Sequence, residues 1–161
     1  MKAAFTEEQK FNQWWLWLII NGICVIALYG AYKQIILGET FGSSPMSSAG
    51  IIAFVLFAFA FAGMFLWTRL STKIDSETIE MNYVPFLSKS VKWEEVATAS
   101  VVDYGFIGGW GIRFTKKYGK VYNTRGKMGL AIVLKNGDKF LIGTQKESEL
   151  SDFVTSHFSQ A

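Results

Sequence analysis

The chain has 161 residues, which is about one domain, and half of these residues are apolar. Its single cysteine, Cys24, and its single histidine, His157, exclude a disulfide framework, a thiol metal cluster and most catalytic triads. The net charge of +3 is small, and thirteen of the sixteen lysines and arginines lie from Arg69 onward. Because no recognised binding motif accompanies this modest charge, nucleic acid is not an expected partner.

The first part of the chain predicts two membrane-spanning helices. Residues 1–13 form a short polar segment, and residues 14–32 and 49–68 are two uncharged apolar runs. Each run is close to the roughly 20 residues that cross a hydrocarbon core about 30 Å thick. Their leucine, isoleucine, phenylalanine and valine residues contribute about −2 to −5 kcal/mol in the first run and about −3 to −6 kcal/mol in the second. Both runs are therefore expected to insert into a membrane.

Two other interpretations of the apolar runs are disfavoured. Helices that are apolar all round need burial on every side, and the rest of the chain is too small and too rich in strand patterns to cover two of them. The first run is long for the apolar region of a signal peptide, and no small-x-small cleavage site follows it cleanly.

The distribution of basic residues predicts the topology. The loop 33–48 contains one basic residue, Lys33, whereas Lys2, Lys10, Arg69 and Lys73 flank the two spans. The positive-inside rule therefore places both termini in the cytoplasm and the loop outside. Aromatic residues are expected to mark the membrane interfaces. The expected anchors of the inner interface are Trp14, Trp15, Trp17 and Trp67, and those of the outer interface are Tyr29 and Tyr32.

Small residues predict where the two spans meet. Gly22 and Gly30 lie two turns apart in the first span, and Ala58 and Ala62 lie one turn apart in the second, so both pairs permit close backbone approach. Asn21 is the one strongly polar side chain in the spans, and we expect it to make an interhelical hydrogen bond. Because a transport pathway needs more polar groups than this, a channel or transporter is disfavoured. Ser47 or Ser48 can cap the second helix.

Residues 69–161 predict a small β domain. Roughly seven short strands are indicated by alternating patterns and turn residues, beginning with a hairpin of 70–74 and 78–83 around Asp75-Ser76-Glu77. The Asn136-Gly137 pair predicts a two-residue type I′ hairpin, which would pair Val133 with Phe140. The strands of this hairpin carry apolar residues on both faces, so we expect both faces to be covered.

The end of the chain predicts an amphipathic helix. Thr144 followed by Glu147 has the pattern of a capping box. The apolar stripe that follows has helical spacing. It consists of Leu150, Phe153, Val154, His157 and Phe158. The expected fold is therefore a membrane α-helical hairpin followed by an antiparallel β-barrel or sandwich that a C-terminal helix closes.

The β domain resembles the bacterial pleckstrin-homology-like domains over residues 69–158. The resemblance rests on the strand order, the segment GGWGIR (108–113), the Asn136-Gly137 hairpin leading to LIGT (141–144), and the terminal amphipathic helix. Such domains are often fused to one or two membrane spans, which implies a location in the bacterial cytoplasmic (inner) membrane. The resemblance implies a fold and a location rather than a reaction, and the phosphoinositide-binding residues of eukaryotic members cannot be matched.

Two segments of the β domain are candidate sites. The glycine-rich stretch 105–111 is followed by a strand rather than by a helix, so a structural role is favoured over a phosphate-binding loop. The second segment is basic, and no acidic residue lies between Asp103 and Asp138. Its candidate contacts to lipid or to a partner are Arg113, Lys116, Lys117, Lys120, Arg125 and Lys127. Each cation near an anionic leaflet contributes about 1 kcal/mol, although an ordinary solvated hairpin remains the alternative.

No residues with the pattern of a catalytic, metal or cofactor site emerge, and an enzyme is not expected. His157 falls on the apolar stripe of the terminal helix, where a packed histidine is the simpler interpretation, and Cys24 would lie in lipid. The expected function is an accessory or scaffold subunit of a membrane assembly, whose partners are other membrane subunits or a second copy. The alternative is binding or sensing of anionic lipid headgroups through the basic segment.

Overall fold

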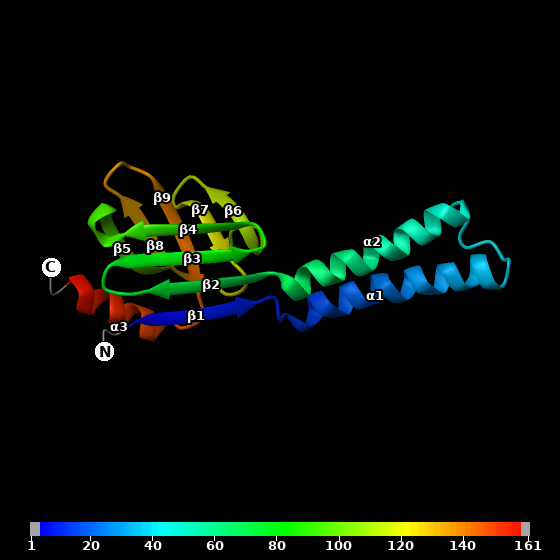
Figure 1. Ribbon diagram of the computed structural model, residues 1–161, viewed down its shortest axis with the longest axis horizontal. Coiled ribbons are helices and arrows are strands. Elements are labelled where there is room, and N and C mark those ends of the chain that lie inside the picture. The colour runs from blue at the N-terminus through cyan, green and yellow to red at the C-terminus, as the bar shows by residue number, and fades with distance from the viewer. Residues whose placement is uncertain (1–3, 159–161) are drawn as a thin grey trace. The chain divides into compact units, whose positions relative to one another are not determined.

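The computed structural model describes the backbone of residues 4–158 and the side chains of residues 4–156. The chain forms two compact units, which are coloured along the sequence in Figure 1. The helical unit is Asn12–Trp67. The β domain combines the residues up to Phe11 with those from Thr68 onward. The β domain is therefore built from both sides of the helical unit in the sequence.

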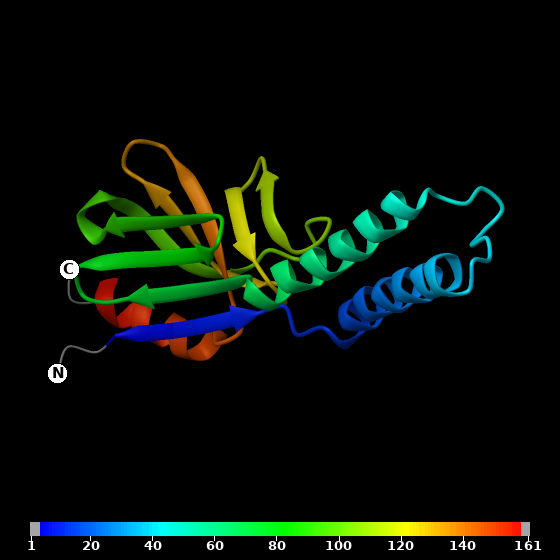
Figure 2. The ribbon, with the colours of Figure 1, turned by 45° about the vertical axis from the view of Figure 1, so that its right-hand side comes forward.

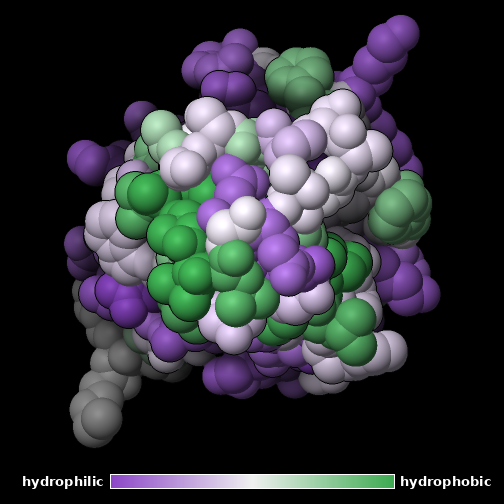
Figure 3. All heavy atoms as spheres, turned by 90° about the vertical axis from the view of Figure 1, so that its right-hand side faces the viewer, coloured by the Kyte–Doolittle hydropathy of each residue, from purple (hydrophilic) through white to green (hydrophobic). Residues whose placement is uncertain are grey.

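The helical unit is a pair of helices. Helix α1 (Trp14–Ala31) continues into the π-helical turn η1 (Tyr32–Ile36), and helix α2 is Ser48–Trp67. The first helix thus runs four residues beyond the expected end at residue 32, and the loop is correspondingly shorter. The Ser47 hydroxyl accepts a hydrogen bond from the Gly50 amide at 3.1 Å, which confirms Ser47 as the cap of α2. Figure 3 shows the loop end of this unit, where polar loop residues lie among apolar helix side chains.

The first sheet of the β domain, sheet A, has four antiparallel strands in the order β1-β2-β3-β4. Its strands are β1 (Phe5–Lys10), β2 (Arg69–Ile74), β3 (Thr78–Val84) and β4 (Leu87–Lys92). The hairpin expected between β2 and β3 is present, because the Asp75 carboxylate accepts hydrogen bonds from the Glu77 and Thr78 amides at 2.9 and 2.8 Å.

Strand β1 was not expected from the sequence, which predicted only a polar segment over residues 1–13. It pairs with β2 along its whole length, from Phe5 opposite Ile74 to Lys10 opposite Arg69. Alternate β1 side chains are buried, but only one of the three inward positions is apolar: Phe5 is followed inward by Glu7 and Gln9. Two polar residues in the inward stripe removed the apolar alternation by which a strand is recognised.

The buried polar side chains of β1 bind the second sheet. The Glu7 carboxylate accepts hydrogen bonds from the Thr144 hydroxyl at 2.6 Å and from the Gln145 amide at 2.7 Å. The Gln9 amide donates to the Gly143 carbonyl at 2.6 Å, and its oxygen accepts from the Thr124 hydroxyl at 3.1 Å. Residues before the helical unit are therefore an integral part of the β domain.

The second sheet, sheet B, has five strands in the order β5-β8-β9-β7-β6. Its strands are β5 (Val96–Asp103), β6 (Gly111–Thr115), β7 (Gly119–Asn123), β8 (Met128–Leu134) and β9 (Lys139–Thr144). The pairing of β7 with β9 is parallel and the other pairings are antiparallel. A short 3₁₀ turn, η2 (Trp93–Glu95), links the two sheets.

The two sheets form separate layers of the β domain, as Figure 2 shows. No strand of sheet A pairs with a strand of sheet B in the described residues, so the sheets do not close into the barrel that was one of the two expected forms. They pack through a shared apolar core, and the buried Tyr83 hydroxyl of β3 donates to the Asn123 carbonyl of β7 at 3.2 Å. The largest core side chains include Leu70, Ile74, Ile79, Met81, Leu130, Ile132, Leu141 and Ile142.

The hairpin between β8 and β9 is shifted by one residue from the expected register. Ile132, not Val133, pairs with Phe140. The Gly137 amide donates to the Leu134 carbonyl at 2.9 Å, and Gly137 has a φ of +92°. No non-glycine residue in the described chain has a positive φ, so the type I′ turn is excluded for Asn136. The loop is instead the three-residue type, in which only the glycine takes the left-handed conformation.

The C-terminal helix α3 (Glu147–Phe158) packs on β5, β1 and β8. Leu150 and Val154 of the expected stripe are buried and Phe153 is half-buried, while the side chains of His157 and Phe158 lie outside the described residues. The capping differs from the expected box. The Thr144 hydroxyl accepts from the Lys146 amide at 3.0 Å and donates to Glu7, so a carboxylate from β1 takes part in ordering the start of α3.

Candidate membrane anchor and anion-binding surface

The helical unit has the dimensions of a membrane anchor. Its two candidate spans have 23 and 20 residues, and at 1.5 Å per residue the shorter is about 30 Å long. Both are long and apolar enough to span a membrane. Large apolar side chains such as Leu18, Val25 and Leu56 are exposed around both helices, and few are buried. This exposure fits helices surrounded by lipid better than helices buried in a protein core.

The contact between α1 and α2 uses some of the predicted small residues. Ala58 is buried, and the Cys24 thiol lies 3.7 Å from its carbonyl oxygen. Gly30 is also buried, and a Cβ there would lie 3.2 Å from Ile51 of α2 and 2.8 Å from the Phe41 ring of the loop. Ala62 is half-buried. Close approach therefore occurs at Ala58 and Gly30.

The other two predicted contact residues lie elsewhere. A Cβ on Gly22 would meet no atom within 4 Å, so this glycine is not needed for close approach. The Asn21 side chain is exposed, and its amide donates to the Trp17 carbonyl at 2.7 Å, one turn earlier in the same helix. Asn21 thus satisfies its amide within α1 rather than against α2.

The predicted tryptophan anchors gather at one end of the helical unit. Trp14 and Trp15 begin α1 and Trp67 ends α2, and the two helices are antiparallel neighbours joined by a short loop. Trp14, Trp15 and Trp67 are exposed, whereas Trp17 is half-buried. This arrangement matches an aromatic belt at one membrane interface. It is the interface at the end of the helical unit where the chain enters from β1 and leaves to β2.

The six predicted basic residues are all exposed, but they do not form one surface. On the β6–β7 hairpin, Arg113 pairs with Val121 and Phe114 pairs with Lys120, so Arg113 and Lys120 point to opposite faces of sheet B. The Arg113 guanidinium lies over Gly109, where a Cβ would be 2.9 Å from Nη2. Lys116 and Lys117 lie in the turn, and the Lys117 ammonium is 4.8 Å from the Tyr118 ring.

The remaining two basic residues lie beyond β7, and one of them is neutralised. The Lys127 ammonium lies 2.8 Å from the Asp103 carboxylate. This hydrogen bond, with one from the Gly105 amide, lowers the pKa of Asp103 below its ordinary value. Lys127 is therefore held in an ion pair, and Arg125 also takes part in other interactions. The basic segment is divided rather than continuous.

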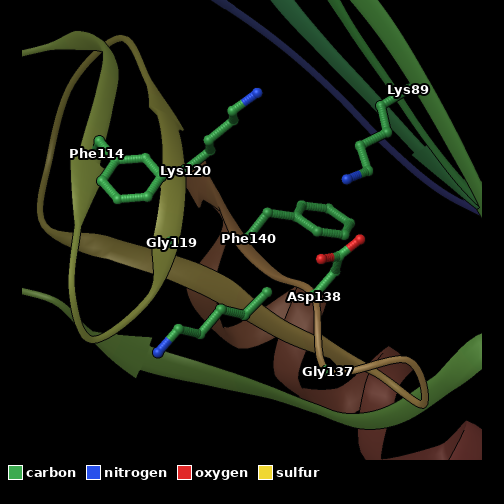
Figure 4. Close-up of a pocket in the computed structure, with 8 residues that line it drawn as sticks. Lys89, Phe114, Gly119, Lys120, Gly137, Asp138 and Phe140 are labelled. Atoms are coloured by element: carbon green, nitrogen blue, oxygen red, sulfur yellow. The ribbon is translucent and has the colours of Figure 1, made fainter.

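A cavity of about 360 Å³ gathers a different set of cations. It lies at the open edge of the β domain, between β4 of sheet A and strands β6, β7 and β9 of sheet B. Figure 4 shows the Lys89 ammonium next to the Phe140 ring and the Lys120 side chain extending from β7 on the other side of the cavity. The Lys89 ammonium lies 4.0 Å from the centre of that ring. The charged residues that line the cavity are Lys89, Lys120, Lys139 and Asp138.

The chemistry of the cavity fits a small anion. Three ammonium groups against one carboxylate leave an excess of positive charge, and Phe114 and Phe140 supply apolar walls. One of the three is partly committed, because the Lys139 ammonium donates to the Lys116 carbonyl at 2.6 Å. Lysine binds phosphate groups as a point charge, so a phosphate or carboxylate group suits this lining.

Only Lys120 of this set was predicted as a site residue. Lys89 lies on β4 and Lys139 follows the β8–β9 turn, so these cations come from three separate strands. In the sequence Lys89 and Lys139 lie outside the basic segment that contains Lys120, and no spacing rule relates the three lysines. Their proximity depends on how sheet A packs on sheet B, which the sequence pattern does not specify.

The glycine-rich stretch forms a loop before β6, and no helix follows it directly. Gly105, Gly108 and Gly109 have positive φ, and Ile107 packs against a small core of Tyr104, Val121 and Leu141. In the described chain, no three His, Cys, Asp or Glu side chains come together as a metal site would need.

Comparison with known proteins does not assign the chain to a family. Neither the models of known protein families nor the curated protein sequences gave a match to the chain.

Proposed function

We propose that the protein is a non-enzymatic membrane protein whose two spans hold the β domain at the membrane surface as an interaction module. The observation that carries this proposal is the insertion of the helical unit between two paired strands. Lys10 and Arg69 are register partners at one end of sheet A, and the helices begin at Trp14 and end at Trp67. Two connections of only one to three residues limit how far the domain can move from the bilayer, which suits a scaffold or accessory subunit.

The same feature supports one part of the proposed topology, that both ends of the helical unit lie on one side of the membrane. That this side is the cytoplasm, in a bacterial inner membrane, is proposed from the distribution of basic residues and from the resemblance. Strand β1 precedes the first span and β2 follows the second, so their pairing requires both to lie on one side. A Ser43→Cys variant in a Cys24→Ala background tests the orientation. An impermeant thiol reagent should label residue 43 from outside intact cells. Labelling only after the cytoplasm is opened would overturn the proposed orientation.

The proposed partner is another membrane subunit or a second copy of the chain. Cross-linking in native membranes, followed by purification in mild detergent, should retain a species larger than the single chain. Recovery of an isolated monomer alone, with and without cross-linker, would contradict the scaffold proposal.

A second candidate function is recognition of an anionic lipid headgroup or a free phosphate by the cavity around Lys89 and Lys120. The full chain in nanodiscs of neutral lipid would be titrated with glycerol phosphate, and binding should weaken as salt is raised. Lys120→Gln should reduce the affinity, whereas Lys117→Gln, outside the cavity, should not. Equal effects of the two substitutions would indicate general attraction rather than this cavity. Added phosphatidylglycerol should compete with glycerol phosphate if the natural ligand is a headgroup.

Two finer expectations remain proposals. A relationship to pleckstrin-homology-like domains is supported by the strand order from β2 to β9 and the terminal helix, although β1 is an addition and the sheets stay open. A small transporter is less well supported, because the Asn21 amide bonds within its own helix and the other strongly polar residues of the first span, Lys33 and Gln34, lie in its last turn η1.

A further inference from the structure

One end of sheet A carries both connections to the helical unit. Lys10 pairs with Arg69, and Arg69 pairs with Val84, so these residues form a row across β1, β2 and β3. Neighbouring strands are about 4.8 Å apart, which makes the row about 10 Å wide. The turn between β3 and β4 directly follows Val84. We call this part of the β domain the tether end.

The tether end lies close to the end of α2 whatever the angle between the two units. Only Thr68 separates Trp67, the last residue of α2, from Arg69. Two residues of extended chain span at most about 7 Å. The tether end is therefore the part of the β domain that a membrane holding α2 would meet first.

Exposed aromatic side chains gather at this end. Phe86, in the β3–β4 turn, is 52% exposed, and its ring lies 5.9 Å from that of Tyr83. Phe106, in the loop before β6, is 80% exposed and contacts Trp110 edge-on at 6.4 Å. This loop leads into Gly111, where a Cβ would lie 3.9 Å from the Tyr83 hydroxyl. Figure 2 shows the loop projecting from the β domain beside β6.

The chemistry of these residues fits a lipid surface. Large aromatic side chains prefer the boundary between headgroups and acyl chains, where the ring is in apolar surroundings and tryptophan can still hydrogen-bond. Lys10 and Arg69 lie exposed at the same end, 3.3 and 3.9 Å from the Glu8 carboxylate, and the one positive charge that this group of three keeps in excess suits anionic headgroups. A protein partner would also accept aromatic rings, but the bilayer is already within the reach set by Thr68.

We propose that Phe86 and Phe106, with the half-buried Trp110 beside Phe106, insert into the headgroup–acyl boundary of the membrane that holds α1 and α2. The β domain is then docked on the bilayer by its tether end as well as linked to it. This inference rests on the proposed function, because it requires the two helices to span the membrane. It goes further by assigning a lipid-contacting surface to the domain.

Spin labels on the full chain test the docking. Single cysteines would be placed by Phe86→Cys and Phe106→Cys in a Cys24→Ala background, with Ser76→Cys as the matched control. Ser76 is exposed in the β2–β3 turn, at the opposite end of sheet A. The labelled protein would be reconstituted into vesicles of phosphatidylcholine and phosphatidylglycerol. Accessibility to oxygen and to a water-soluble nickel chelate gives the depth of each label.

Labels at residues 86 and 106 should be accessible to oxygen and shielded from nickel, at a depth of about 5–10 Å. The label at residue 76 should show the opposite pattern. Nickel accessibility at 86 and 106 equal to that at 76 would overturn the inference, as would shielding of both labels from oxygen and nickel together, which marks a protein contact. The labels replace exposed side chains, so the domain core is retained.

A fourth label separates failure of this inference from failure of the proposed function. Leu56 lies near the middle of α2 and is 66% exposed. A Leu56→Cys label should reach a depth near the bilayer centre if α2 spans the membrane. Nickel access at residue 56 would refute the membrane-spanning proposal itself. Shielding at 56 combined with nickel access at 86 and 106 would refute the docking alone.

Discussion

The buried carboxylate of Glu7 offers a direct test of whether the N-terminal strand belongs to the β domain. Glu7 is 7% exposed and accepts two hydrogen bonds from the end of β9 and the residue that follows it, just before α3. The Glu7→Ala substitution leaves the Thr144 hydroxyl and the Gln145 amide without this partner. Leaving the buried Thr144 hydroxyl unsatisfied costs about 1–3 kcal/mol and losing the part-buried bond of the Gln145 amide about 0.5–1.5 kcal/mol, so the free energy of unfolding should fall by roughly 2–4 kcal/mol.

The neighbouring Glu8 provides the matched control. Its side chain points to the opposite face of β1 and lies 3.3 Å from Lys10 and 3.9 Å from Arg69, all in exposed positions. Exposed ion pairs contribute about 0–1 kcal/mol, so Glu8→Ala should change stability little. The two substitutions remove the same chemical group one residue apart, and only the face of the strand differs.

Amide hydrogen exchange on the full chain in detergent measures the difference locally. Peptides covering β9 and the first turn of α3 report the opening of this region. A loss of 2 kcal/mol corresponds to about 30-fold faster exchange there, because each 1.4 kcal/mol is a factor of ten. Exchange rates in Glu7→Ala that match those in Glu8→Ala would refute the assignment of β1 to the domain core.

Three further results are expected. Gly119 has a φ of +69°, and a Cβ there would overlap a β9 carbonyl oxygen. Gly119→Ala should therefore lower the free energy of unfolding by roughly 2–4 kcal/mol in a urea titration. Gly137 also has a positive φ but open surroundings, so Gly137→Ala should lower it by only about 1–2 kcal/mol. Burial raises the pKa of Tyr83 above its ordinary value of 10.0. The free energy of folding that the protonated Tyr83 hydroxyl contributes is therefore fully present below about pH 10 and is lost as the pH rises further. Tyr83→Phe should flatten that loss when unfolding is followed by circular dichroism. In detergent, Ala58→Leu should lower thermal stability by about 1–3 kcal/mol because Ala58 is buried between the helices, whereas Asn21→Leu should not.

The elements that the sequence predicted well are those with an unbroken local pattern. The two apolar runs correspond to α1 and α2, and the strands 70–74 and 128–134 match β2 and β8 to within a residue. The capping of α2 by Ser47 follows from a local rule and is confirmed. The Asn136-Gly137 turn was located correctly but in the wrong register, because the same dipeptide serves two loop lengths that differ in which residue takes a positive φ.

The remaining features depend on long-range packing. Strand β1 escaped prediction because Glu7 and Gln9 occupy inward positions, and their partners lie 137 and 134 residues away in the sequence. The cavity lysines come from separate strands, so no spacing identifies them. The basic segment 113–127 was recognised as a charge cluster, but strand alternation sends Arg113 and Lys120 to opposite faces. Composition therefore indicated charge in this region without indicating which charges would meet.

The placement of the helical unit between β1 and β2 has a consequence for biosynthesis. Strand β1 is synthesised first, yet its partner β2 emerges only after both helices have been made. With both helices across the bilayer, the two strands return to the same compartment and sheet A can form. If only one helix inserts, β1 and β2 are left on opposite sides of the membrane and neither finds its partner. If the helices span the membrane as proposed, completion of the β domain would report correct membrane integration, and a failed insertion would leave the β2 edge unpaired and prone to aggregation or proteolysis.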